Sequence, residues 1–181
     1  LIPASYLNIA LGPLVQTWRI GFSDARIPNN AEVTHALSLT DPQLIELDPL
    51  SCTVFLAKEG MKLDLGCLAK GYIADKIADY LKSQHVMSAL INLGGNIKTI
   101  GANVLANRPW QIGIQDPRQP RGTNLAVLPI CNQSVVTSGT YERKLQVNEH
   151  TYHHILDRKT GYPVDTQLAS ITIISDNSLD G

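Results

Sequence analysis

Residues 68–100, LAKGYIADKIADYLKSQHVMSALINLGGNIKTI, decide the fold class of this chain. From Leu68, apolar side chains recur every three or four residues, which is typical of an amphipathic helix of about four turns. Residues 86–93 then form an apolar run, Gly94-Gly95 a tight turn, and residues 97–100 a returning strand. Two adjacent glycines suit a hairpin, because both central residues can take positive φ.

The flanking sequence extends this pattern in both directions. Gly12-Pro13 starts or breaks a helix within residues 2–18, and a loop, a short helix and a second loop are expected over residues 22–45. Strands are expected over residues 45–56 (one or two), 126–131, 134–138 and 169–175, with a Pro-rich loop over 116–123. Together these elements favour a single α+β domain over residues 1–181, with a largely antiparallel sheet and packed helices.

The composition excludes several classes of protein. Hydrophobic residues make up 44% and charged residues 17% of the 181 residues, which excludes disorder and allows one core or two small intertwined lobes. A formal net charge of -1 gives no basis for binding nucleic acid. No apolar run approaches the roughly 18–20 residues that span a bilayer. The chain begins with Leu1 and ends at Gly181, which predicts a fragment of a longer protein.

The three cysteines are Cys52, Cys67 and Cys131, and they lie far apart in the sequence. They show neither C-x-x-C nor the Cys/His spacing of a zinc site. Since cysteine is among the most often buried residue types, we expect three buried, inert thiols.

One candidate binding segment is residues 63–72, LDLGCLAKGY, which runs through Gly66 into the predicted helix. Unpaired N–H groups and the positive dipole end at a helix start attract phosphate, and Lys70 adds a charge in the first turn. Asp64 either accepts hydrogen bonds from a ligand or caps the helix.

A second candidate is residues 152–163, YHHILDRKTGYP, which we call the histidine loop. It concentrates proton-handling groups before a Gly/Pro turn, as binding and catalytic loops do. His154 is either a structural residue or a base, and in an extended segment His153 points to the opposite side. Thr137-Ser138-Gly139, taken alone, indicates a turn.

These segments, in this order, resemble motifs of the FAD:protein FMN transferases, the ApbE family. Five stretches carry the resemblance: YLNIALGPLVQTW (6–18), the 63–75 segment, ALINLGGNI (89–97), VTSGTYER (136–143) and the histidine loop. Asn8 stands where the family has Asp, and Arg158 where it has Pro. An asparagine keeps the hydrogen-bond acceptor for flavin but loses the charge.

The resemblance implies particular site residues. His154 would be the general base, and Asp157 would orient it. Magnesium would be held by the backbone carbonyl of Cys67. Asp180 is a second candidate ligand, although spacing favours a residue after Gly181. FAD would be contacted by Tyr6, Leu7, Asn8, Asp64, Lys70, Gly94, Gly95, Ser138, Gly139, Ile155 and Thr160.

The activity implied by the resemblance is Mg²⁺-dependent transfer of FMN from FAD to a Thr or Ser hydroxyl of an acceptor flavoprotein, with release of AMP. It also implies an extracytoplasmic, membrane-associated protein, held by a lipid anchor outside this sequence. Two alternatives keep the same site: an FAD pyrophosphatase that yields FMN and AMP, and a flavin-binding module without turnover.

Overall fold

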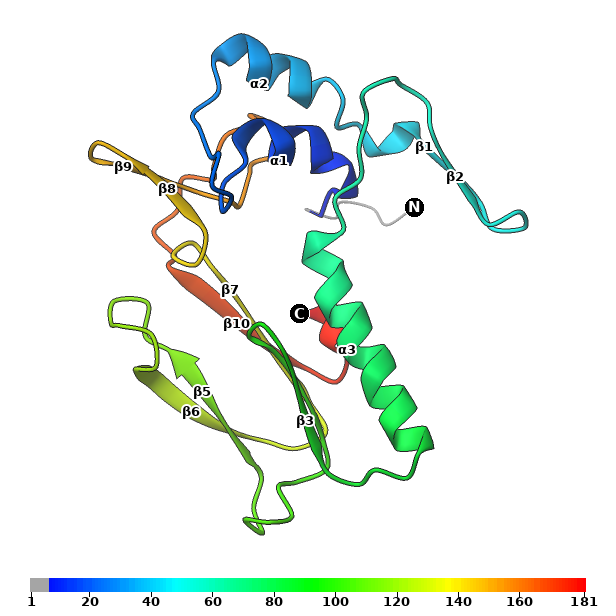
Figure 1. The fold of residues 1–181 in the computed structure, drawn as a ribbon, viewed down its shortest axis with the longest axis vertical. Helices are drawn as coiled ribbons and strands as arrows, with labels where there is room; N and C mark the ends of the chain where they lie inside the picture. The colour runs from blue at the N-terminus through cyan, green and yellow to red at the C-terminus, as the bar shows by residue number, and fades with distance from the viewer. Residues whose placement is uncertain (1–6) are drawn as a thin grey trace. The chain divides into compact units, whose positions relative to one another are not determined.

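The computed structural model describes residues 7–181 and divides into two compact units (Figure 1). Unit 1 comprises the described residues up to Leu65 together with Thr140–Gln167. Unit 2 comprises Gly66–Gly139 and Leu168–Gly181. Each unit is therefore assembled from two separate stretches of chain. The single domain expected over residues 1–181 stays a prediction.

Unit 1 is built from short helices and two hairpins. Its elements are η1 (Ile9–Leu11), α1 (Gly12–Trp18), α2 (Asn30–Leu37), η2 (Pro42–Leu44), β1 (Ile45–Asp48), β2 (Thr53–Leu56), β8 (Lys144–Val147) and β9 (His150–His153). Pro13 lies in the first turn of α1, where a missing N–H breaks no helical hydrogen bond, as predicted. A capping box starts α2, in which Asn29 and Glu32 each accept the other's backbone N–H.

The core of unit 1 joins helices α1 and α2 to the histidine loop. Leu14, Val33 and Ala36 are buried, and Leu156 and Tyr162 of the loop pack against them. The indole Nε1 of Trp18 donates to the Gly161 carbonyl oxygen at 2.8 Å. A second apolar cluster, Ala10, Leu39 and Met61, lies under the β1–β2 hairpin, whose Leu56 packs on it.

Unit 2 is a four-stranded antiparallel sheet in the order β10-β7-β4-β3, with a helix on one face. Its elements are α3 (Gly66–Ser83), β3 (Ala89–Leu93), β4 (Asn96–Ile100), β5 (Trp110–Gln115), β6 (Asn124–Ile130), β7 (Ser134–Gly139), β10 (Ser170–Ser175) and η3 (Ser178–Asp180). Ala74 and Ala78 of α3 pack against Ile91 and Ile100 of the sheet. The β5–β6 hairpin covers the opposite face, where its Ile112 and Ile130 pack with Val135 of β7.

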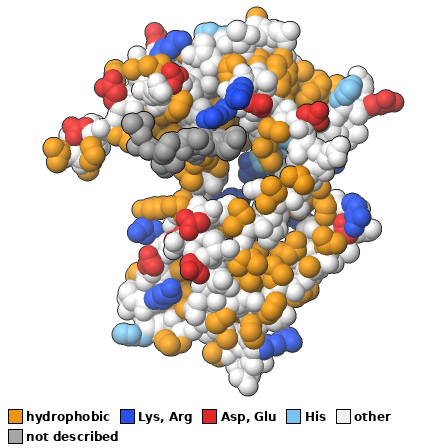
Figure 2. Space-filling view, turned by 180° about the vertical axis from the view of Figure 1, so that it is seen from behind, with side chains coloured by type: hydrophobic (Ala, Val, Ile, Leu, Met, Phe, Trp, Pro, Cys, Tyr) orange, Lys and Arg blue, Asp and Glu red, His pale blue; other side chains and the backbone are white. Residues whose placement is uncertain are grey.

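The outer edge of this sheet is apolar. Strand β10 is an edge strand, and Ile171, Ile173 and Ile174 along it are all exposed. Figure 2 shows hydrophobic side chains spread over one face of unit 2, the lower part of the picture. In the described residues 7–181, no helix has the length and apolar character that a bilayer crossing requires.

The predicted α+β class with antiparallel strands is confirmed. The helix begins two residues earlier than expected, at Gly66, and the hairpin turn lies at Gly94-Gly95 as predicted. Three strands were not predicted: β5, which pairs with β6, and the pair β8 and β9. The β8–β9 hairpin precedes the histidine loop and includes its first two residues.

The expectation of three buried thiols is wrong, because Cys52, Cys67 and Cys131 are all exposed. Cys52 sits at the tip of the β1–β2 hairpin with φ 54°. Cys67 lies in the first turn of α3, and Cys131 follows the last residue of β6. Turns and helix starts lie at the surface, so the position of each cysteine overrides the general preference of the residue type for burial.

Candidate functional site

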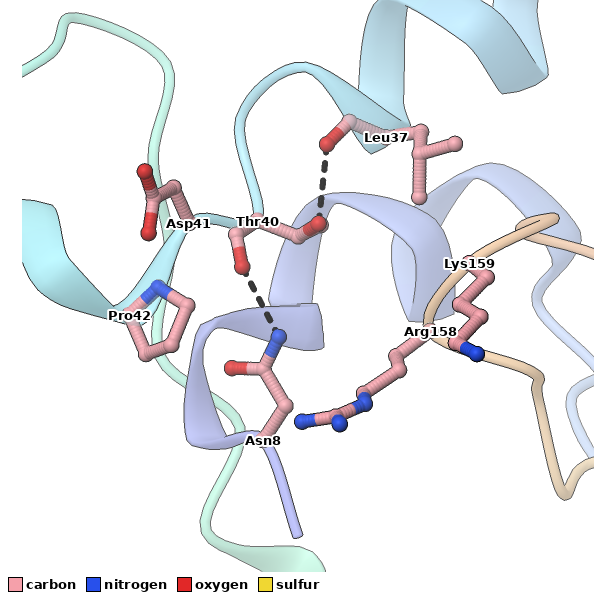
Figure 3. A pocket seen from close by; sticks show the side chains of 7 residues that line it. All are labelled: Asn8, Leu37, Thr40, Asp41, Pro42, Arg158 and Lys159. Atoms are coloured by element: carbon pink, nitrogen blue, oxygen red, sulfur yellow. Dashed lines mark hydrogen bonds between the residues drawn. The ribbon is translucent and has the colours of Figure 1, made fainter. Parts of the chain in front are cut away.

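Unit 1 contains a hollow of about 350 Å³ whose wall includes two cations. It is lined by Asn8, Leu37, Thr40, Asp41, Pro42, Arg158 and Lys159. In Figure 3 the Arg158 side chain extends towards Asn8, and Lys159 comes from the same loop. The N-terminal motif and the histidine loop, about 150 positions apart in the sequence, thus meet at one cavity.

Asn8 is almost fully buried and ties two segments together. Its Oδ1 accepts the Ala10 N–H at 2.9 Å, and its Nδ2 donates to the Thr40 carbonyl oxygen at 2.8 Å (Figure 3). An aspartate here could accept the first bond but could not donate the second, so the asparagine adds a bond that the usual family residue lacks.

Two further predicted flavin contacts, Asp64 and Leu7, lie near Asn8. The Asp64 backbone N–H donates to the Ile9 carbonyl oxygen at 2.8 Å, which brings the 63–72 segment beside the N-terminal motif. Leu7 is exposed next to it. Tyr6 lies outside the described residues.

His153 is fixed by the backbone of its own loop. Its Nδ1 accepts the Ile155 N–H at 3.3 Å, and its Nε2 lies 2.9 Å from the Val164 carbonyl oxygen. A carbonyl oxygen only accepts, so Nε2 is the donor in this contact. His153 is therefore engaged as a structural residue at both nitrogens.

His154 presents a different arrangement. Its Nδ1 lies 3.3 Å from the Arg143 carbonyl oxygen, which accepts the Nδ1 proton. Nδ1 is thus engaged with the backbone, and Nε2 is the nitrogen that a base would use. The ring is half-buried.

Asp157 and Thr160 shape the turn that follows. One Asp157 carboxylate oxygen, Oδ1, accepts the Lys159 N–H at 2.7 Å, and the Thr160 hydroxyl accepts the Tyr162 N–H at 3.3 Å. Gly161 has φ 75°, and a Cβ there would lie 2.8 Å from Val33 Cγ1. Ile155 is exposed and accepts the Val164 N–H through its carbonyl. The orientation of His154 by Asp157 stays a prediction.

In unit 2, the Gly94-Gly95 turn is open on its outer side. Both glycines have positive φ, 61° and 93°, and a Cβ built on either would meet no atom within 4 Å. Positive φ explains why glycine is needed, and the open space leaves room for a flat ligand to approach the backbone.

Strand β7 ends beside this turn. Ile97 pairs with Val135, so the same register sets Ser138 level with Gly94. Thr137-Ser138-Gly139 is therefore the end of a strand, which corrects the turn expected from these three residues alone. Ser138 is exposed and Gly139 is buried.

The first turn of α3 lies at the same end of unit 2. Cys67 and Lys70 are both exposed there. Gly71 is buried, and a Cβ on it would lie 2.6 Å from the Ser178 carbonyl oxygen and 2.8 Å from Leu179 Cα. The missing side chain thus allows η3, which ends at Asp180, to pack directly on the helix backbone.

The turn η3 is tied to α3 and the sheet by polar side chains whose role the sequence did not show. Asp75 accepts the backbone N–H groups of Ser178 and Leu179, and Lys98 lies 3.5 Å from the Asp75 carboxylate. Asp75 is the last residue of the 63–75 motif, and this position was the only sequence signal that it has a role in the site. Lys98 belongs to no motif used to predict site residues, and Arg158 and Lys159 lie within the histidine loop but were not predicted as site residues.

The predicted site residues thus fall into two groups, one in each unit. Unit 1 holds Leu7, Asn8, Asp64, His154, Ile155, Asp157 and Thr160. Unit 2 holds Cys67, Lys70, Gly94, Gly95, Ser138, Gly139 and Asp180. Among the described residues, no three His, Cys, Asp or Glu side chains cluster as metal ligands would.

Comparison with known proteins identifies similar chains. The sequence model described as the ApbE family matches residues 3–181. FAD:protein FMN transferases from Klebsiella pneumoniae (strain 342) and Treponema pallidum (strain Nichols) are 49% and 39% identical, over 100% and 96% of this chain. The chain spans about half the length of these relatives, 55% and 51%.

Solved structures agree with the sequence matches. The crystal structure of the ApbE protein of Thermotoga maritima superimposes with a TM-score of 0.85 at 32% identity, covering 96% of this chain and 55% of that one. The flavinyl transferase ApbE of Pseudomonas stutzeri gives 0.78 at 29% identity, covering 96% and 53%.

Proposed function

Because this chain belongs to the ApbE family, we propose that it forms part of an FAD:protein FMN transferase. The enzyme would move the FMN moiety of FAD to a hydroxyl group of an acceptor flavoprotein and release AMP. The two relatives that carry this name align with essentially the whole chain, which supports the proposal.

The observation that carries the proposal furthest is the gathering of residues at one end of unit 2. The exposed start of α3, with Lys70, lies at the same end as the Gly94-Gly95 turn and Ser138. N–H groups at a helix start and a lysine in its first turn suit the pyrophosphate of FAD. The open Gly-Gly turn suits the close approach of a planar ring system.

A magnesium ion fits the donors at this end of unit 2. The resemblance supports the Cys67 carbonyl as one ligand, with Asp180 as a second candidate, although the spacing of the motif favours a residue after Gly181. The Cys67 carbonyl and the Asp180 carboxylate are hard oxygen donors, which magnesium prefers to a thiolate. When bound, magnesium would neutralise the charge that develops on the pyrophosphate.

The protein's own residues supply positioning and proton transfer in this proposal. Nε2 of His154 would take the proton of the acceptor hydroxyl, since an imidazole titrates near neutral pH. The hydroxyl oxygen would attack the phosphorus of the FMN moiety, and the bond from that phosphorus to the bridging oxygen would break, so that AMP leaves. Lys70 would hold the phosphates throughout, and Asp157 would orient His154.

The proposal also covers the acceptor group and the cellular location of the protein. The acceptor group would be a Thr or Ser hydroxyl, and the protein would act outside the cytoplasm, held to the membrane by a lipid anchor. The resemblance of the sequence motifs supports both statements.

Product analysis tests the function directly. The protein as it is encoded would be incubated with FAD, Mg²⁺ and a recombinant flavoprotein domain that is known to carry covalent FMN on a Thr or Ser. Covalent flavin on that domain and an equal amount of AMP are expected, and a chelator should abolish both. Free FMN with AMP would instead identify an FAD pyrophosphatase, and unchanged FAD a binding module.

A further inference from the structure

The last residue of helix α1, Trp18, contacts both ends of the histidine loop. Its side chain is buried, and its ring centroid lies 5.6 Å from that of Tyr152 and 5.6 Å from that of Tyr162. The first ring pair is tilted by 36° and the second meets edge to face at 77°, arrangements in which aromatic rings attract each other. Trp18 Nε1 also donates to the Gly161 carbonyl oxygen at 2.8 Å. One side chain thus joins the first residue of the loop to the turn near its end.

The chain that follows Trp18 supports the partner of His154. A Cβ on Gly21, which has φ 94°, would lie 2.9 Å from Arg143 Cδ, so the backbone at Gly21 packs directly on the Arg143 side chain. The Arg143 carbonyl oxygen accepts the backbone N–H of His154 at 3.3 Å and lies 3.3 Å from its Nδ1. Residues 18–21 therefore lie against the histidine loop and also against the residue to which the His154 ring is bonded.

The two bonds to Arg143 make the place of the His154 ring sensitive to its backbone. Both are longer than the usual N–H···O distance of about 2.7–3.2 Å, so a small displacement of the loop would break them. Tyr152 lies only two residues before His154 in the sequence. A movement of Tyr152 away from Trp18 would therefore carry the imidazole with it.

We propose that Trp18 is a positioning residue for His154: by holding both ends of the histidine loop, it sets the place of the imidazole. This inference rests on the proposed function, because it gives Trp18 a part in the transfer reaction. Trp18 acts through the loop, without contact to FAD or to the acceptor. A displacement of about 1 Å at a reacting group can cost about 10²-fold in rate.

A purely structural role for Trp18 predicts a different result. If Trp18 only stabilised unit 1, its replacement would lower the melting temperature, and the molecules that remain folded would turn over at the rate of the wild type. If Trp18 positions His154, kcat falls in the folded protein. The KM for FAD is then retained, because the base acts on the acceptor hydroxyl and not on the bound FAD.

The test is Trp18→Phe in the protein as it is encoded, with two measurements. Phenylalanine keeps an aromatic ring in the core but has no N–H, so the Gly161 carbonyl oxygen loses its donor. The NMR signals of the His154 ring, identified by their disappearance in His154→Ala, should shift. Transfer to the acceptor domain at saturating FAD should show kcat about 10–100-fold lower, with an unchanged KM for FAD.

A double-mutant cycle separates an effect through His154 from a general one. Two changes that act on the same step through the same group are not additive. Trp18→Phe should therefore reduce transfer in the wild type but cause little further loss in His154→Ala. Losses that multiply in the double variant would show that Trp18 does not act through His154.

Two further variants complete the design. Leu56→Ala, in strand β2, removes packing from the separate cluster of Ala10, Leu39 and Met61. It should destabilise unit 1 without changing the His154 signals or kcat. Tyr152→Leu serves if Trp18→Phe fails to fold, because Tyr152 is only half-buried. It removes one ring contact and leaves the bond to Gly161, so it should shift the His154 signals and lower kcat by a smaller factor.

The outcomes distinguish this proposal from the proposed function. Unchanged His154 signals in folded Trp18→Phe would overturn the positioning role, whatever the rate of transfer. Shifted signals with an unchanged kcat would overturn the part of Trp18 in the reaction. A wild-type protein that transfers no flavin would overturn the proposed function and the catalytic purpose of Trp18, and the NMR signals would still decide whether Trp18 places the ring.

Discussion

The histidine loop of unit 1 and the turn η3 of unit 2 are both held firmly against their own unit, but by different means. Neighbouring residues shape the loop: His153, Asp157 and Thr160 accept backbone N–H groups two positions away on the chain, and the long-range bond from Trp18 to Gly161 then ties the loop to α1. The turn η3 is held by Asp75, Lys98 and Ser134, which are 44 to 104 positions from the groups they contact.

The difference separates two ways of fixing a functional segment. Local side-chain–backbone hydrogen bonds shape a turn as soon as the chain bends. Each contributes only modestly to stability, because the groups remain near water. A buried polar cluster forms only when the unit is complete, and removing one member leaves the others without partners in a site of low dielectric constant. Changes in the loop should therefore have graded effects on stability, whereas changes in the buried polar cluster around η3 should act together.

The largest effect is expected at His154. His154→Ala should reduce flavin transfer by about 10²–10⁴-fold, the usual contribution of general acid–base catalysis, with FAD affinity nearly retained. His153→Ala is the matched control, because its ring is bonded at both nitrogens within the loop. It should lower the melting temperature and affect transfer far less. A larger loss of transfer in His153→Ala would show that the base is misassigned.

Replacing one glycine by alanine in each region allows the histidine loop and η3 to be compared. Gly161→Ala forces alanine to φ 75° and places Cβ against Val33, so the free energy of unfolding should fall by about 2–4 kcal/mol. Gly71→Ala gains about 1 kcal/mol of helix propensity but pushes against the backbone of η3. Because its Cβ would meet backbone atoms of Ser178 and Leu179, the free energy of unfolding should still fall, by about 1–3 kcal/mol in chemical denaturation.

Hydrogen exchange distinguishes the two glycine variants further. Gly71→Ala should accelerate exchange at Ser178 and Leu179, whereas Gly161→Ala should leave those amides unchanged. Equal exchange in both variants would mean that η3 is not held through its contact with α3.

The next effect concerns the phosphate site at the start of α3. Lys70→Ala should weaken FAD binding by about 1–3 kcal/mol, the range for a hydrogen bond to a charged group. Calorimetry with the folded variant measures this directly, and Lys82→Ala in the last turn of the same helix is the control. Unchanged FAD affinity in Lys70→Ala would argue against the pyrophosphate site.

A smaller, pH-dependent effect tests local capping in unit 1. The hydrogen bonds from Arg26, followed by that from the Asn29 N–H, lower the pKa of Glu32 from 4.5 to about 2. A lowered carboxyl pKa means that stability is present above pH 4.5 and is lost as the pH falls towards 2. Wild type should melt higher than Glu32→Gln at pH 6, and the gap should close at pH 2. A difference in melting temperature that stays the same at both pH values would show that it does not come from the ionised Glu32 carboxylate.

The smallest effect is expected at Cys67. Cys67→Ala should retain Mg²⁺-dependent transfer, because the proposed ligand is the backbone carbonyl and magnesium prefers oxygen to sulfur. Measuring transfer against Mg²⁺ concentration checks this. Loss of the metal dependence in a folded Cys67→Ala protein would contradict the carbonyl assignment.

Periodicity predicted much of the fold because the deciding patterns are local. The helix that became α3, the Gly94-Gly95 hairpin and the short helix α2 all follow from neighbouring residues. Strand β8 alternates polar and apolar residues over only four positions, and β9 is largely polar, so the signal of this hairpin was too short to be recognised. The exposure of three cysteines depends on where each lies in a turn, which residue type alone does not reveal.

The site was predictable where a motif is contiguous and unpredictable where it is assembled in space. The histidine loop and residues 63–72 were found as stretches of sequence. Lys98 looks like any strand lysine until the fold buries it beside Asp75. Arg158 and Lys159 gain their place at a hollow only because the histidine loop folds back towards Asn8.

The interleaving of the two units has a consequence for biosynthesis. Trp18 reaches its partner Gly161 only 143 positions later, and Asp75 meets Leu179 after 104. At about 5–20 residues per second, the ribosome leaves either unit incomplete for on the order of ten seconds. Once β7 has been made, its edge stays unpaired until β10 follows, and an unpaired strand edge invites association with other chains. Neither unit can be obtained by a single cut, so each is complete only after the second of its two stretches of chain has been made.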